Sequence, residues 1–308
     1  MRNGHLNTVY PTLFRKQPTP AYNRQQVLTP DDDFLDIDTL FQNRSRLAIL
    51  CHGLEGCSTS QYMMATATLL QEKGWDVACI NYRSCSGRLN KQVRMYHSGA
   101  TDDLHTVIEH YKENYEELAL VGFSLGGNLV LKYSGDKKYT VDSKIQRVVA
   151  VSVPVDLMAG CINICRISNF IYQKNFMKSL TAKVRQKNEQ HPDAFDLGLL
   201  KKIKTLFDFD DYFTGPIHGF QDAEDYYTRC SSKQFLGGID RSTLIINALD
   251  DPFLPEECYP YEEVNENPNL AMLTPAHGGH VGFVIRGQRY FWIEQTIEAF
   301  LNQKNGTL

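Results

Sequence analysis

The sequence predicts an α/β fold built on a buried, mostly parallel β-sheet. Strand-like segments alternate with amphipathic helical segments along most of the 308 residues, and this alternation is typical of parallel strands joined by helices. The expected strands are continuous apolar runs, as in sheets that are covered on both faces. Apolar residues make up 42% of the chain, enough for a large core, so global disorder is excluded.

The first part of the chain is expected to differ from this pattern. Residues 1–25 carry three prolines and are expected to form an irregular arm. Residues 26–28 and 34–40 flank the acidic turn at 29–33, a pattern that predicts an antiparallel hairpin with a polar turn.

The elements that follow are predicted from apolar runs, helical periodicity and a glycine that ends a helix. In chain order they are a strand at 47–51, a helix at 61–73 closed by Gly74, a strand at 75–80, a helix at 102–111, a strand at 118–121, a helix at 127–133, strands at 147–153, 243–248 and 270–273, and a helix at 288–301.

The alternation is interrupted between residues 155 and 238, which are helical in character and offer no strand. We therefore expect a core domain made of residues 1–154 and 239–308, with residues 155–238 inserted as a helical cap over the carboxyl edge of the sheet. The alternative is a second helical layer without a role at a functional site. Lysines mixed among the apolar residues of 157–190 are interpreted as a solvated face.

Charge and hydropathy exclude several classes of protein. The formal net charge is −4, which gives no reason to expect a nucleic-acid partner. No run of 18 apolar residues occurs, so no membrane span is expected. Residues 1–7 contain no apolar stretch of the kind found in secretory signals.

The eight cysteines are interpreted as reduced thiols of a cytoplasmic protein, because the chain is long and no signal is recognised. Cys51 and Cys79 lie within apolar runs, where a free cysteine behaves as a small hydrophobic residue. Cys161 and Cys165 have helical spacing but no further Cys or His cluster nearby, so no metal site is expected.

The most informative motif is Gly122-Phe123-Ser124-Leu125-Gly126, which lies between an expected strand and an expected helix. A G-x-S-x-G in this context is typical of a sharp turn that raises the serine hydroxyl above the sheet. Gly122 and Gly126 are required because a Cβ at either position would collide with the neighbouring strand or helix. Ser124 is therefore the candidate nucleophile.

A serine hydroxyl needs a base to accept its proton and an acid to orient that base. Asp250 and Asp251 follow the strand at 243–248, and either carboxylate could serve as the acid. His280 follows the last expected strand and two glycines, which allow a tight loop aimed back at the serine. His277 precedes that turn and is the weaker candidate for the base.

The negative oxygen of a tetrahedral intermediate needs two backbone N–H donors. The N–H of Leu125, directly after the candidate nucleophile, is expected to be one of them. The second is expected from Leu54, in the loop after the strand that ends at His52-Gly53. Gly53 and Gly56 allow this backbone to approach closely.

These motifs together resemble the YheT-like branch of the α/β-hydrolases, and the matching pieces run nearly from end to end of the chain. They are residues 3–8, His52-Gly53-Leu54-Glu55-Gly56, Tyr96-His97-Ser98-Gly99, residues 122–128, residues 153–157, Asp225-Tyr226-Tyr227, Asp250-Asp251-Pro252-Phe253 and Gly279-His280-Val281-Gly282-Phe283. The resemblance implies an α/β-hydrolase fold with an inserted helical cap.

The resemblance also bears on the site. It implies carboxylic-ester hydrolysis through Ser124, His280 and one aspartate of the 250–251 pair. Asp251 is favoured because it begins a D-x-x-L-P stretch similar to the D-x-x-V-P around the family's acid. Ser84 departs from the family, which often has glycine there. The N-terminal membrane anchor of eukaryotic members is not recognised, which favours a soluble esterase of the bacterial type.

The predicted function is that of a serine hydrolase that needs no cofactor or metal and acts on small-molecule or lipid-like esters. An apolar acyl chain is expected under the cap. One alternative is an acyltransferase that uses the same three side chains, since His97 and Asp102 match a short H-x4-D pattern of lipid acyltransferases. The other is a non-catalytic ligand-binding protein that keeps the fold.

Overall fold

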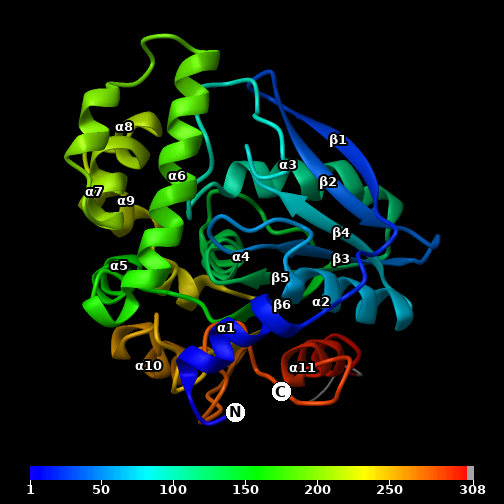
Figure 1. The fold of residues 1–308 in the computed structure, drawn as a ribbon. Helices are drawn as coiled ribbons and strands as arrows, with labels where there is room; N and C mark the ends of the chain where they lie inside the picture. Colours follow the sequence, from blue (N-terminus) through cyan, green and yellow to red (C-terminus); the bar gives the residue numbers. More distant parts are fainter. Residues whose placement is uncertain (304–308) are drawn as a thin grey trace.

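An eight-stranded sheet forms the centre of the computed structural model, which describes residues 1–303 (Figure 1). The strand order is β1-β2-β4-β3-β5-β6-β7-β8. The bounds are Asn23–Thr29 for β1, Asp33–Leu40 for β2, Arg46–Cys51 for β3, Asp76–Asn81 for β4, Glu117–Phe123 for β5, Ile145–Val151 for β6, Ser242–Ile246 for β7 and Leu270–Leu273 for β8.

The parallel part of the sheet contains β4, β3, β5, β6, β7 and β8. At one edge β1 and β2 form an antiparallel hairpin, and β2 also pairs antiparallel with β4. In the hairpin Val27 lies opposite Leu35. The prediction of a mostly parallel sheet with an N-terminal hairpin is therefore confirmed. Because parallel strands end at a common edge, the loops after β3, β5, β7 and β8 meet there.

Helices cover both faces of the sheet. Two of them, α2 (Gln61–Glu72) and α11 (Trp292–Leu301), share a buried apolar cluster with one face. The other face packs against α3 (Thr101–Tyr111) and α4 (Leu125–Gly135). A short helix, α10 (Tyr261–Glu266), packs beside β8. The layered α/β architecture predicted from the sequence is confirmed.

Five α-helices lie between β6 and β7 in the chain, and we call them the inserted helices. They are α5 (Leu157–Ile164), α6 (Phe170–Gln190), α7 (Leu206–Phe209), α8 (Gly215–Ile217) and α9 (Ala223–Cys230). Residues 155–238, all of them described, contribute no strand to the sheet. The inserted helices have apolar clusters of their own and stand beside the sheet in Figure 1.

The expectation of an irregular arm over residues 1–25 is wrong for residues 4–14, which form a helix, and for residues 23–25, which begin β1. Residues Gly4–Phe14 form helix α1, and the side chain of Asn3 accepts a hydrogen bond from the Leu6 N–H as its cap. Pro11 lies inside this helix, where proline usually disfavours helical structure. Asn7 and Pro11 are buried against the rest of the molecule, so tertiary packing outweighs the local preference.

The state of the cysteines bears on where the protein is found. All eight cysteines are free thiols; the cytoplasmic location expected from them stays a prediction. Among residues 1–303, no helix has the length and apolar character that crossing a membrane requires.

Candidate active site

Ser124 lies at the turn between β5 and α4, in a strained backbone conformation with φ of +54°. Its N–H donates to the Val151 carbonyl at 2.8 Å, which ties the turn to the next strand. A Cβ added at Gly122 would collide with the Gly126 carbonyl, and one at Gly126 would collide with the Cys51 carbonyl. The sharp turn expected from the motif is therefore present, and its two glycines are sterically required.

The structure brings Ser124, His280 and Asp251 together from three loops at the same edge of the sheet. The Ser124 hydroxyl lies 2.9 Å from Nε2 of His280. Nδ1 of His280 lies 3.0 Å and 3.2 Å from the two carboxylate oxygens of Asp251. Since a carboxylate only accepts, Nδ1 carries the proton and Nε2 is free to accept from the serine.

Asp250, the alternative acid, has different partners. Its Oδ1 accepts the backbone N–H groups of Gly278 and Gly279 at 2.7 and 2.8 Å. Its Oδ2 lies 3.2 Å from Nδ1 of His277, a side chain that is 46% exposed. Asp250 and His277 therefore stabilise the loop that carries His280, and neither contacts the Ser124 hydroxyl in the way that His280 does.

One residue of this region, Thr8 on helix α1, was not assigned a role from the sequence. Its hydroxyl accepts the backbone N–H of His280 at 2.9 Å and donates to the Gly4 carbonyl at 2.7 Å. A Cβ at Gly279, whose φ is +59°, would press on the same helix. The residue 3–8 motif was the only sequence signal, and it did not indicate this contact.

The loop after β3, which carries Leu54, is held rigidly. The Gly53 N–H donates to the Tyr62 hydroxyl at 2.9 Å, and the Gly53 carbonyl lies 2.7 Å from Nδ1 of His52. Nε2 of His52 accepts the Tyr82 N–H at 3.3 Å, so Nδ1 bears the proton. Burial lowers the pKa of His52 to about 3, and its neutral form fixes this pattern of hydrogen bonds at neutral pH.

The same loop is joined to the inserted helices by a buried ion pair. Nζ of Lys183, on α6, lies 2.7 Å from a carboxylate oxygen of Glu55, and the side chains are 15% and 7% exposed. The Tyr96 hydroxyl donates to this carboxylate at 2.7 Å and accepts the Glu55 N–H at 2.8 Å. The backbone next to Leu54 is thereby linked to α6.

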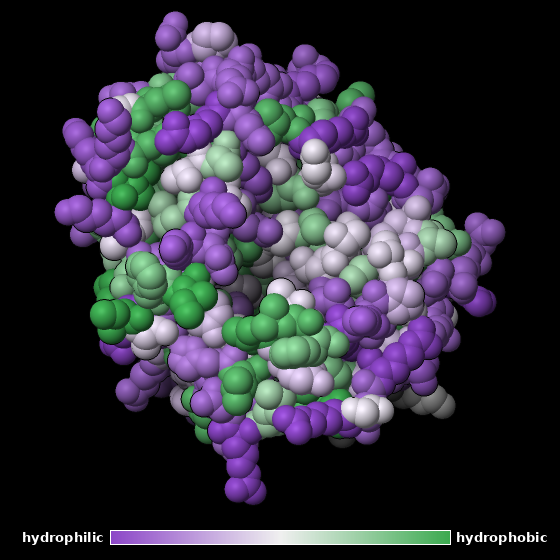
Figure 2. All heavy atoms as spheres, viewed as in Figure 1, coloured by the Kyte–Doolittle hydropathy of each residue, from purple (hydrophilic) through white to green (hydrophobic). Residues whose placement is uncertain are grey.

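A cavity lies between the inserted helices and the sheet, and Ser124 and His280 line it together with Leu54 and Leu125. Figure 2, viewed as Figure 1, shows a hollow in the surface with hydrophobic side chains at its border. Most of the lining is apolar, with side chains from the core and from the inserted helices: Leu54, Pro154, Leu157, Ile164, Phe176, Leu180, Leu206, Phe209, Phe253 and Leu254. The cavity therefore suits an apolar group beside the serine.

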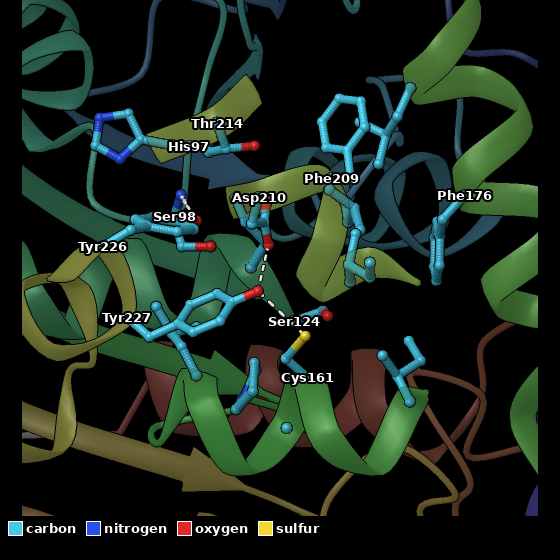
Figure 3. A pocket seen from close by; sticks show the side chains of 18 of the residues that line it. His97, Ser98, Ser124, Cys161, Phe176, Phe209, Asp210, Thr214, Tyr226 and Tyr227 are labelled. Atoms are coloured by element: carbon cyan, nitrogen blue, oxygen red, sulfur yellow. Dashed lines mark hydrogen bonds between the residues drawn. The ribbon is translucent and has the colours of Figure 1, made fainter. Parts of the chain in front are cut away.

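Polar side chains gather at one side of this cavity, and we call this group the polar corner (Figure 3). It consists of His97, Asp210, Thr214, His218, Tyr226 and Tyr227, and all of these except His218 are labelled in Figure 3. The Tyr227 hydroxyl donates to a carboxylate oxygen of Asp210 at 2.5 Å and lies 3.1 Å from the Cys161 sulfur. Burial raises the pKa of Asp210 to about 6, although hydrogen bonds from Thr214 and Tyr227 oppose the shift.

The two residues of the H-x4-D pattern are not paired. The carboxylate of Asp102 accepts from Arg94 at 2.8 Å at the start of α3. The imidazole of His97 packs against that of His218, with ring centroids 4.5 Å apart. Burial lowers the pKa of His97 well below its usual value.

Among the described residues, no cluster of His, Cys, Asp or Glu is arranged to hold a metal ion.

Comparison with known proteins identifies the family of this chain. The family described as alpha/beta hydrolase fold matches residues 48–286. YheT from Escherichia coli (strain K12), a protein provisionally named an esterase, is 35% identical over 97% of this chain and 90% of its own length.

Two eukaryotic proteins are more distant relatives. A monoacylglycerol lipase from Saccharomyces cerevisiae is 29% identical over 92% of this chain and 65% of its own length. The phospholipase ABHD3 from Mus musculus is 27% identical over 90% of this chain and 70% of its own length.

A solved structure, the esterase Pf2001 from Pyrococcus furiosus, superposes with a TM-score of 0.62 over 94% of this chain and 98% of that chain. Its sequence identity is 15%, so the likeness concerns the fold alone.

Proposed function

Because this chain belongs to the alpha/beta hydrolase family, in the branch that includes YheT, we propose that it is a serine hydrolase that cleaves carboxylic esters. The observation that carries the proposal is the line of contacts from the Ser124 hydroxyl through His280 to Asp251. This arrangement activates a serine for acyl transfer in unrelated folds.

In the proposed reaction, Nε2 of His280 accepts the Ser124 proton while the serine oxygen attacks the ester carbonyl. Asp251 holds the imidazole in its tautomer and stabilises the imidazolium that forms. His280 then donates the proton to the departing alcohol, which leaves an acyl-enzyme. A water molecule, deprotonated by the same imidazole, attacks this intermediate. The bond to the Ser124 oxygen then breaks, the imidazolium returns the proton to that oxygen, and the acid is released.

The negative oxygen of the tetrahedral intermediate would be bound by the N–H groups of Leu125 and Leu54. Leu125 is the first residue of α4, so its N–H has no acceptor within the helix and lies at the positive end of the helix dipole. The bonds of Gly53 to His52 and Tyr62 hold the backbone before Leu54. Loss of one such donor typically reduces turnover by about 100- to 1,000-fold.

The cavity supports a choice of substrate class. Its largely apolar lining beside Ser124 favours an ester with an apolar acyl chain, either a small molecule or a lipid. Relatives named as a monoacylglycerol lipase and a phospholipase support this choice. The inserted helices, residues 155–238, would then serve as the cap that shields the acyl chain from water, and the mechanism needs no cofactor.

The test is hydrolysis of p-nitrophenyl octanoate by the purified protein and its Ser124→Ala variant. We expect the variant to lose at least about 10⁴-fold in kcat and to lose labelling by a fluorophosphonate probe. Ser134→Ala, on the same helix, is the matched control, since the Ser134 hydroxyl only donates to the Val130 carbonyl. Full ester hydrolysis by Ser124→Ala would refute the mechanism.

A further inference from the structure

The polar corner contains a carboxylate in an unusual setting. Asp210 begins a π-helical turn, Asp210–Thr214, inserted between α7 and α8. Such turns are rare and occur frequently at functional sites. Figure 3 shows the Asp210 side chain and the Tyr227 hydroxyl turned toward each other above Cys161, in the cavity that Ser124 lines.

No lysine or arginine among residues 1–303 forms an ion pair with Asp210. Tyr227 and Thr214 supply hydrogen bonds to its carboxylate, which leaves acceptor capacity free because a carboxylate has about four lone-pair sites. A buried charge without a cation is costly to maintain. The fold therefore keeps an acceptor with spare capacity at the polar corner of a largely apolar cavity, as a binding site does.

We propose that Asp210 and Tyr227 form a subsite that binds a hydroxyl group on the alcohol part of the ester. This inference rests on the proposed function. The apolar side of the cavity accommodates the acyl chain, and the alcohol part is then the half of the substrate that reaches the polar corner. The carboxylate of Asp210 accepts the hydrogen bond from the substrate hydroxyl.

The neighbours of Asp210 favour a hydroxyl over an ammonium group. The Tyr226 oxygen accepts the Ser98 N–H at 2.9 Å, so its own proton is free to be donated. Nδ1 of His218 lies 2.8 Å from the Thr214 carbonyl, to which it donates. Nε2 of His218 is then an acceptor, buried and without a partner among the described residues. Donors and acceptors side by side match a hydroxyl, which does both, whereas an ammonium group only donates.

The experiment compares three esters of the same acid: monodecanoylglycerol, which carries two free hydroxyls, propyl decanoate, which carries none, and decanoylcholine, which carries a cation. The enzymes are the wild type, Asp210→Asn and Tyr227→Phe. Asp211→Asn is the matched control, because it removes the same charge one residue away. Asp211 accepts the Ala223 N–H at 3.2 Å and does not line the cavity.

We expect the wild type to have a higher kcat/KM for monodecanoylglycerol than for propyl decanoate. Asp210→Asn should reduce that ratio by about tenfold, the usual difference between a charged and a neutral acceptor, and Tyr227→Phe should reduce it less. Asp211→Asn should leave it unchanged. Because damage to the fold would lower both activities alike, the ratio reports on hydroxyl binding.

Three outcomes would overturn parts of this account, and they are distinguishable. An unchanged ratio in Asp210→Asn, with both esters cleaved, would overturn the subsite and leave the proposed function standing. A selective loss on decanoylcholine would replace the hydroxyl by a cationic group as the ligand. Failure of the wild type to cleave any of the three esters, while it also fails on p-nitrophenyl octanoate, would overturn the proposed function itself.

Discussion

The backbone N–H of His280 donates to the hydroxyl of Thr8 at 2.9 Å, although 272 residues separate them in the chain. The N-terminal helix α1 therefore holds the loop that places the imidazole beside Ser124. Thr8 does not line the cavity, so its effect on the reaction would pass through the position of His280.

The first prediction concerns Thr8. Thr8→Val removes the hydroxyl at nearly constant volume, and we expect kcat to fall by about tenfold because small displacements of a catalytic group are costly. KM should change little, since the cavity is untouched. Thr8→Ser, which keeps the hydroxyl, should restore kcat. Loss of thermal stability in Thr8→Val with wild-type kcat would show that the contact is only structural.

The second prediction separates the neighbouring aspartates. Asp251→Asn should lower kcat by about 10⁴-fold, because an amide cannot hold His280 in the required tautomer. Asp250→Asn should keep most of the activity but lose about 2 kcal/mol of unfolding free energy, since its carboxylate accepts two N–H groups of the loop. Steady-state kinetics and urea unfolding measure both effects. The reverse order of the two kcat values would contradict the assignment.

The third prediction concerns the ion pair between Lys183 and Glu55. Lys183→Met leaves the Glu55 carboxylate, 7% exposed, without its ammonium partner, and we expect a loss of about 3 kcal/mol in unfolding free energy. Faster amide hydrogen exchange in α6 should accompany it. The double variant Lys183→Met with Glu55→Gln should recover part of the loss, because no charge is left buried.

Lys178→Met is the control for this pair, since Lys178 lies on the same helix with its side chain exposed. Its unfolding free energy should stay within about 0.5 kcal/mol of the wild type. Equal losses in Lys178→Met and Lys183→Met would mean that the ion pair does not join α6 to the loop.

The fourth prediction concerns Asp210 and pH. Its pKa is about 6 in the folded protein against an ordinary value of 3.8, so between these values the folded state holds a proton that the unfolded state has lost. The unfolding free energy therefore decreases as pH rises through this window. The full loss of stability caused by the ionised Asp210 carboxylate is present above pH of about 6. Asp210→Asn should be more stable than the wild type at pH 8, by about 1–3 kcal/mol.

The difference should shrink toward zero below pH of about 4, where Asp210 is protonated in both states. Urea unfolding of wild type and variant at a series of pH values measures it. A gain that does not change with pH would show that repacking, and not the charge, is responsible. The combined result, higher stability with weaker discrimination between esters, is the trade-off expected of a binding site.

Much of the fold could be predicted because its signals are local. Continuous apolar runs mark the parallel strands, and Gly122 and Gly126 leave the turn around Ser124 little freedom, since a Cβ at either position meets backbone. His280 could be selected because two glycines precede it at the end of the last strand. Such features follow from steric limits and hydrophobic periodicity over a few residues.

Other features depended on contacts between distant parts of the chain. The helix at Gly4–Phe14 forms despite Pro11 because packing stabilises it, and no local pattern reports that packing. The inserted helices could be located as an interruption of the alternation. Their positions in space, which bring Asp210 and Tyr227 into the cavity with Ser124, could not be inferred from composition.

The sequence by itself determined the parallel sheet, the turn at Ser124 and the choice of candidate side chains, because steric exclusion and periodicity act between neighbouring residues. Only the tertiary structure decided that Asp251 rather than Asp250 meets His280, that Thr8 holds the histidine loop and that a lone carboxylate faces the cavity. The direction of a side chain is set by the packing of segments that can lie hundreds of residues apart. No single stretch of sequence contains both partners of such a contact, so its energy cannot be inferred from local patterns.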